Sequence, residues 1–154
     1  MVDADDRAVV AEQLGRAPRA LRRVAVRCPF GRPAVTEQSP FDDQGNPFPT
    51  MFYVTCPQLV ARIATLEAAG GVNRWTAAAR DDTELAASLA LAHAEQRALR
   101  PELAAGIAGS TRPGSLKCLH AHAAFALARS GYLLGDRILA ELGELWPADR
   151  CCSA

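Results

Sequence analysis

Apolar residues recur at the spacing of an amphipathic helix in five segments of the chain. These segments are residues 3–15, 57–69, 81–100, 116–128 and 136–145. Gly15, the pair Gly70-Gly71 and Pro101 are expected to end the first three, because glycine and proline interrupt helices. The third segment is predicted to be the longest helix.

Three further segments have the β-branched composition of strands. They are residues 22–28, 33–37 and 51–55, of which the last is the strongest. Residues 39–50, which precede it, are crowded with turn formers and prolines. The pattern therefore predicts an α+β fold: a small three-stranded antiparallel sheet near the N-terminus, with a long second connection, covered by four to five helices.

The length of 154 residues and the apolar share of 49% suit one domain with one core. No repeat or low-complexity linker divides residues 1–154. The segment 3–15 is expected to form an N-terminal helix, and residues 148–154 are expected to form a frayed tail.

Charge and hydropathy make several partners and compartments improbable. The chain has 17 basic and 17 acidic residues, so nucleic acid and anionic lipid are disfavoured. No apolar run approaches the roughly 20 residues of a membrane span, and the acidic start lacks the features of a secretory signal. Five cysteines without an export signal suggest reduced thiols, and the expected location is the cytoplasm.

Cysteines and histidines form the main candidate site, because thiolate and imidazole are the preferred ligands of zinc and of iron-sulfur clusters. Cys28 and Cys56 each end a predicted strand and precede a proline, and Cys118 lies at the start of a predicted helix whose dipole favours a thiolate. On that helix His122 shares a face with Cys118. If Cys118 instead lies in the preceding turn, His120 is the better partner.

The same residues also allow a purely structural interpretation. Their spacing matches no zinc-finger pattern, and isolated cysteines are most often small buried apolar residues. Cys151 and Cys152 lie in the predicted tail, which could fold back to complete a site. His93 is expected at the surface of a helix or the edge of the core.

Other charged residues suggest binding sites, though structural roles are equally ordinary for them. Six arginines between Arg16 and Arg32 could bind phosphate or an acidic partner, or form a solvated face. Glu37, Asp42 and Asp43 could act as acid, base or cation ligands, or simply stabilise turns.

Four sequence segments together resemble the actinobacterial domain of unknown function 501 family. They are residues 27–35, 45–57, 65–68 and 117–121. The resemblance runs from about residue 22 to residue 146, which defines a family-like core. It implies that Cys28, Cys56 and Lys117-Cys118-Leu119-His120 belong to one pattern.

Two departures within this resemblance affect the ligand set. The position of Cys56 can hold histidine in relatives, which favours a metal, and zinc over a cluster. His122 stands where relatives carry an aliphatic residue, so the resemblance favours His120.

The leading hypothesis is therefore a metal-binding protein, zinc first and an iron-sulfur cluster second, with Cys28, Cys56, Cys118 and His120 as ligands and His122 as a substitute. The alternative is a metal-free interaction module that binds a protein partner through Arg16–Arg32, linked to cell division or the envelope. A third hypothesis is a small enzyme that acts on a phosphorylated molecule through Arg32, Lys117 and the loop acids. It requires a pocket in which these residues converge.

Overall fold

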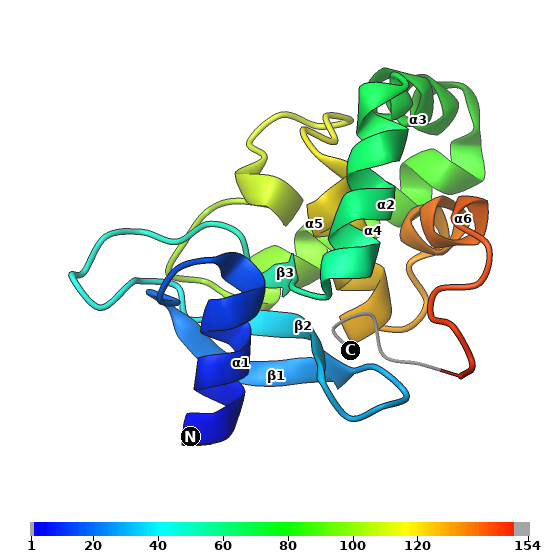
Figure 1. Cartoon of the computed structure of the whole chain (residues 1–154). Coiled ribbons are helices and arrows are strands. Elements are labelled where there is room, and N and C mark those ends of the chain that lie inside the picture. Colours follow the sequence, from blue (N-terminus) through cyan, green and yellow to red (C-terminus); the bar gives the residue numbers. More distant parts are fainter. Residues whose placement is uncertain (1, 150–154) are drawn as a thin grey trace.

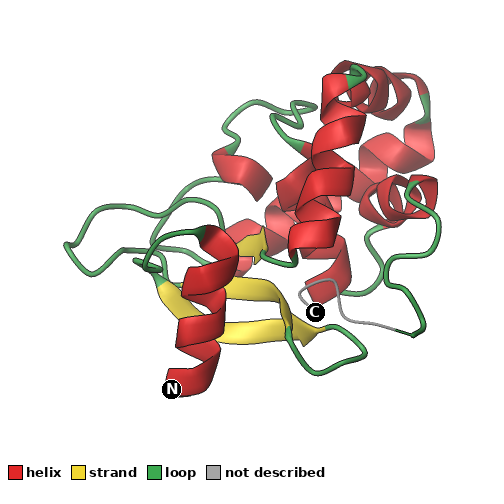
Figure 2. Ribbon diagram, in the orientation of Figure 1, coloured by secondary structure: helices red, strands yellow, loops and turns green. Residues whose placement is uncertain are grey.

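The computed structural model describes residues 2–149, and it confirms the predicted α+β class. A three-stranded sheet lies beside a larger helical layer, as Figure 1 and Figure 2 show. The strands are β1 (Leu21–Arg27), β2 (Pro33–Gln38) and β3 (Phe52–Val54). The helices are α1 (Ala4–Leu14), α2 (Pro57–Ala68), α3 (Gly71–Asp81), α4 (Thr83–Leu99), α5 (Leu119–Ala128) and α6 (Leu133–Glu141), with a 3₁₀-helix η1 (Ile107–Gly109).

The sheet is the predicted antiparallel meander, in the order β1-β2-β3. Val35 of β2 pairs with Val26 of β1 on one side and with Val54 of β3 on the other. Every residue of the central strand β2 is buried, whereas the edge strand β1 has one buried residue, Leu21, and is otherwise exposed or partly buried. The helix α1 lies across the sheet and contacts β2 (Figure 1).

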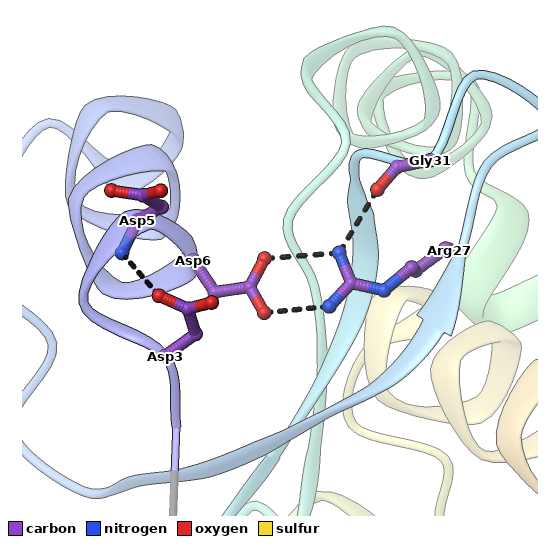
Figure 3. Close-up of polar contacts among 5 residues, drawn as sticks. All are labelled: Asp3, Asp5, Asp6, Arg27 and Gly31. Atoms are coloured by element: carbon purple, nitrogen blue, oxygen red, sulfur yellow. Dashed lines mark hydrogen bonds and ion pairs between the residues drawn. The ribbon is translucent and has the colours of Figure 1, made fainter.

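A bidentate ion pair fastens α1 to the edge strand (Figure 3). The guanidinium of Arg27 donates to both carboxylate oxygens of Asp6, at 2.9 and 2.6 Å, and to the carbonyl of Gly31 at 2.9 Å. The hydrogen bond from Arg27 lowers the pKa of Asp6. The side chain of Asp3 caps the helix by accepting from the N–H of Asp5 at 2.9 Å.

The core is centred on α5, which is buried on nearly all sides. Its alanines at 121, 123, 124 and 126 have little exposed surface, so neighbouring elements approach it closely. Phe125 makes edge contacts with Phe52 of β3 and with Tyr132, each with ring centroids 5.7 Å apart. No helix in the described part of the chain combines the length and apolarity needed to span a bilayer.

The described residues contain one α-helix more than the five predicted segments, because the apolar pattern assigns no element to the residues of α3. Gly70 adopts a left-handed conformation with φ of +84°, which ends α2, but the chain re-enters a helix at once. Two predicted boundaries also shift. α5 begins at Leu119 because Lys117 has φ of +65°, and α6 occupies Leu133–Glu141 rather than 136–145.

Asp82 is the single residue between α3 and α4, and its carboxylate accepts from the N–H groups of Glu84 (2.9 Å) and Leu85 (3.2 Å). We expect Asp82→Ala to lower the free energy of unfolding by about 1 kcal/mol, because two N-terminal donors of α4 lose their acceptor. Urea unfolding measures this change. Asp81→Ala is the control, because Asp81 pairs only with exposed Arg80; an equal loss in both variants would contradict the capping role.

Candidate functional site

The structure places Cys28 and Cys56 at the same end of the sheet, as the strand-exit prediction required. Cys28 directly follows β1, and Cys56 comes two residues after the end of β3. Both β1 and β3 end beside the first residues of β2. The strand β2 lies between them, so their strands are roughly 10 Å apart. Both cysteines are buried members of the core, with exposures of 7% and 1%.

Cys118 is the N-cap residue of α5, in an extended conformation just outside the helix. Burial raises the pKa of its thiol, while the backbone N–H groups of Ala121 and His120 act in the opposite direction. Desolvation thus outweighs the helix donors, which act in the expected direction. Cys118 is partly buried and packs against the core.

His120 uses both ring nitrogens in contacts with other elements. Its Nδ1 lies 2.8 Å from a carboxylate oxygen of Glu67, and its Nε2 lies 3.1 Å from the carbonyl of Val60. The second oxygen of Glu67 accepts from the N–H of Leu119 at 2.9 Å. These contacts join α2 to the first turn of α5.

His122, the substitute ligand, is fully buried and also has both nitrogens engaged. Its Nδ1 lies 2.7 Å from the hydroxyl of Tyr132, and its Nε2 lies 2.9 Å from the carbonyl of Leu116. The carbonyl can only accept, so Nε2 carries the proton and Nδ1 accepts from Tyr132. Burial lowers the pKa of His122 to about 4, so the ring is neutral at pH 7.

The predicted metal ligands thus lie in or beside one core, each with the surroundings just described. Within residues 2–149, no three or more His, Cys, Asp and Glu side chains are grouped so that they could hold a metal ion. Cys151 and Cys152 lie outside the described residues. Metal binding stays a prediction, and the observed contacts give these residues structural roles.

Half of the six arginines of the Arg16–Arg32 segment form intramolecular ion pairs. Three pairs, Arg19–Asp42 at 3.6 Å, Arg23–Glu37 at 2.6 Å and Arg27–Asp6 at 2.6 Å, involve every fourth residue of the segment. A protein partner for this segment stays a prediction.

The loop acids also have structural partners. Asp42 accepts from the backbone N–H groups of Gln44 and Asn46, and these hydrogen bonds lower its pKa. Lys117 donates to the carbonyl of Gly109 at 3.0 Å. Neither Asp42 nor Lys117 lines the cavity between α3, α4 and residues 110–114. The enzyme hypothesis required these residues to converge in a pocket, and they do not converge in that one.

An open cavity of about 650 Å³, most of whose lining residues are exposed at the surface, lies between α3, α4 and the loop of residues 110–114. The residues that line it share one face of each helix, spaced three or four apart. On α3 they are Thr76, Ala79 and Arg80; on α4 they are Ala86, Leu89, Ala90, His93 and Arg97; the loop adds Ser110, Thr111, Arg112, Pro113 and Gly114. Apolar side chains dominate the wall along the first half of α4.

His93 is buried, with 5% exposure, so of its two predicted positions the edge of the core fits better than the surface of the helix. Its Nδ1 accepts from the N–H of Ile107 at 2.9 Å, which places the proton on Nε2. Burial, and then the charge of Arg97, lowers the pKa of His93, while the carbonyl of Ser115 acts in the opposite direction. The ring therefore fastens the segment that leads into the 110–114 loop to α4.

Two further features of the sequence shape this loop. Pro113 and Gly114 occupy the centre of a β-turn closed by Ser115 N–H and the carbonyl of Arg112 at 3.4 Å, and the φ of +78° at Gly114 suits glycine there. The hydroxyl of Ser110 donates to the same carbonyl at 3.0 Å. Arg112 is thereby held at the corner of the turn, on the cavity side.

The cavity has an unbalanced positive charge. Three arginines and no aspartate or glutamate line it. Arg80 pairs with Asp81 at 2.9 Å, but Arg97 and Arg112 make no ion pair with any described residue. Guanidinium groups without a counter-ion favour an anion in the space between them.

Fold and cavity together define a small α+β protein with a basic, mainly apolar cavity between a helix pair and a loop. A family model described as "Protein of unknown function (DUF501)" matches residues 24–107, and the chain belongs to this family. The family prediction is thus confirmed, and an actinobacterial origin stays a prediction. No curated protein and no solved structure matches the chain. The matched region contains Cys28, Cys56, His93 and Arg97, and it ends before Arg112 and Cys118.

Acidification is expected to destabilise the protein through His122. Its pKa of about 4 in the folded chain lies below the ordinary value of 6.5, so the unfolded chain binds the proton more readily. The stability gained from the neutral ring is present above pH 6.5 and lost as pH falls towards 4, by about 3 kcal/mol in all and about 2 kcal/mol by pH 5.

Urea unfolding at pH 7 and pH 5 tests this expectation. His122→Gln should lose less stability between the two pH values than the unmodified chain, because glutamine does not titrate. A residual loss from His93, whose pKa is also lowered, is expected in the variant. Equal pH dependence in both chains would contradict the assignment.

Gly106 is expected to be essential for the position of His93. A Cβ at Gly106 would overlap the imidazole at Nδ1, so Gly106→Ala must displace the ring and break its bond to Ile107. We expect a loss of about 1–3 kcal/mol, typical of overpacking. A double-mutant cycle supplies the control: in a His93→Ala background, Gly106→Ala should cost far less. Additive losses would show that Gly106 acts independently of His93.

Proposed function

We propose that this protein binds a small organic anion with an apolar body in the cavity between α3, α4 and the 110–114 loop. The observation that carries the proposal is the combination of an apolar wall with arginines that have no acidic partner in the lining. Small-molecule sites typically have volumes of about 300–1,000 Å³, mostly apolar walls and a few polar groups that fix orientation. The cavity of about 650 Å³ fits that description.

The charge of the lining excludes two other classes of ligand. A cation would face three guanidinium groups without a carboxylate to bind it. A fully apolar ligand would leave Arg97 and Arg112 without a counter-ion, and would gain nothing from their charge. An anion with an apolar body uses both parts of the wall.

The proposal is limited to binding, because His93 in the lining is not available as a general base. Its Nδ1 is occupied by Ile107, and its Nε2 already carries the proton, so the neutral ring has no free lone pair with which to act as a base.

Binding can be tested with three probes that differ only in charge: para-butylbenzoate, para-butylbenzyl alcohol and para-butylbenzylammonium. We expect the carboxylate to bind with the highest affinity in isothermal titration calorimetry and to raise the melting temperature, because only it offers charge to the arginines. The ammonium probe should bind weakest. Equal affinity of all three, or absence of carboxylate binding at millimolar concentration, would overturn the proposal.

Adjacent residues of α4 provide a matched control for the site. Ala90 lines the cavity, whereas Leu91 is 72% exposed on another face of the helix. Ala90→Trp should fill the cavity and remove carboxylate binding, and Leu91→Trp should leave it unchanged. Loss of binding in both variants would place the ligand elsewhere.

A further inference from the structure

We infer that the ligand is an amphiphile with one oxyanion head group, a carboxylate or a phosphate monoester, which lies between Arg97 and Arg112 with its apolar tail directed along α4 towards the α3–α4 junction. This inference rests on the proposed function. It adds the orientation of the ligand and the number of its anionic head groups.

The order of residues along α4 sets a polarity for the cavity. The lining begins with Ala86, Leu89 and Ala90 and ends with His93 and Arg97. With a rise of about 1.5 Å per residue, Ala86 and Arg97 are roughly 16 Å apart along the helix axis. The apolar wall of α4 therefore lies near the junction at Asp82, and Arg97 lies one turn beyond His93, which holds Ile107 just before the loop.

The arginine near the junction differs from the other two. Arg80 lies two residues before Asp82, and its guanidinium contacts both carboxylate oxygens of Asp81, at 2.9 and 3.4 Å. Both side chains are exposed, so the pair adds little to stability, but Asp81 supplies a local counter-charge. Unbalanced charge remains only at Arg97 and Arg112, at the loop end.

The loop end also offers the donors that an oxyanion needs. Each guanidinium presents several N–H groups in a plane, which match two oxygens of a carboxylate or phosphate. The Pro113-Gly114 turn and the hydroxyl of Ser110 hold the backbone of Arg112 in place. A head group bound there would join the loop to α4 through two charged residues that have no ion pair with the described chain.

Titration of para-butylbenzoate and para-butylphenyl phosphate into arginine variants tests the position of the head group. Arg97→Gln and Arg112→Gln should each weaken binding of the preferred probe by about tenfold or more, because each removes charged hydrogen-bond donors. Arg80→Gln should have a far smaller effect. Arg137→Gln on α6, exposed and outside the cavity, is the control and should have no effect.

The tail is tested with a shortened probe. Ala86→Leu should weaken para-butylbenzoate and leave benzoate, which lacks the butyl group, unaffected. The two probes with different heads identify the oxyanion, and preference for either supports the inference. If anions bind but Arg80→Gln weakens them more than Arg97→Gln and Arg112→Gln do, the inference is overturned while the proposed function stands. If no anion binds, the proposed function itself fails.

Discussion

A buried polar stripe on α4 holds together the parts of this protein that have no regular structure. His93, Gln96 and Arg100 are spaced three and four apart, so they share one face of the helix, and all three are buried. Gln96 donates to the carbonyl of Gly106 at 2.6 Å, and Arg100 donates to the carbonyls of Phe48 and Pro49 at 2.8 and 3.1 Å. Since buried backbone groups must be hydrogen-bonded, this stripe fixes the two long loops that the sheet and helices leave unpaired. The walls of the cavity depend on it, because the 110–114 loop follows directly from the segment that His93 and Gln96 fasten.

The histidines predicted as metal ligands connect elements of the interior. α5 is enclosed by the sheet, α2 and α6, so the histidines that it carries must satisfy their nitrogens locally. His120 does so with Glu67 and Val60, and His122 does so with Tyr132 and Leu116. Their contacts connect α5 with α2 and with the start of α6. A histidine that joins two elements and a histidine that binds a metal have the same sequence signature, and only the surrounding atoms distinguish them.

Sequence pattern predicted most of the fold because most helices bury one face of their own and the strands are rich in β-branched residues. It did not reveal α3, where Gly70-Gly71 indicated a terminator and the following residues include few large apolar side chains. It left His93 either at the surface of α4 or at the edge of the core, because a buried polar stripe has the same spacing as an apolar one. The signal was present in the sequence as His93, Gln96 and Arg100. The cavity could not be predicted, since its walls come from segments up to 38 residues apart whose contact is a tertiary property.

The net charge of the chain does not indicate the charge of the cavity lining, because ion pairs distribute the acidic residues unevenly. The chain is neutral overall, which disfavours extended anionic partners. Many of its acids, however, are paired with arginines elsewhere, as in Arg74–Glu141 and Arg129–Glu95, both at 2.6 Å. Those pairs neutralise charge locally, whereas Arg97 and Arg112 have no ion-pair partner among the described residues and no acidic residue beside them in the lining. A small ligand responds to the charge within about a Debye length, roughly 8 Å in physiological salt, and not to the sum over the chain. A neutral protein can therefore contain a strongly basic site, provided that its acidic residues are held apart from it by the fold.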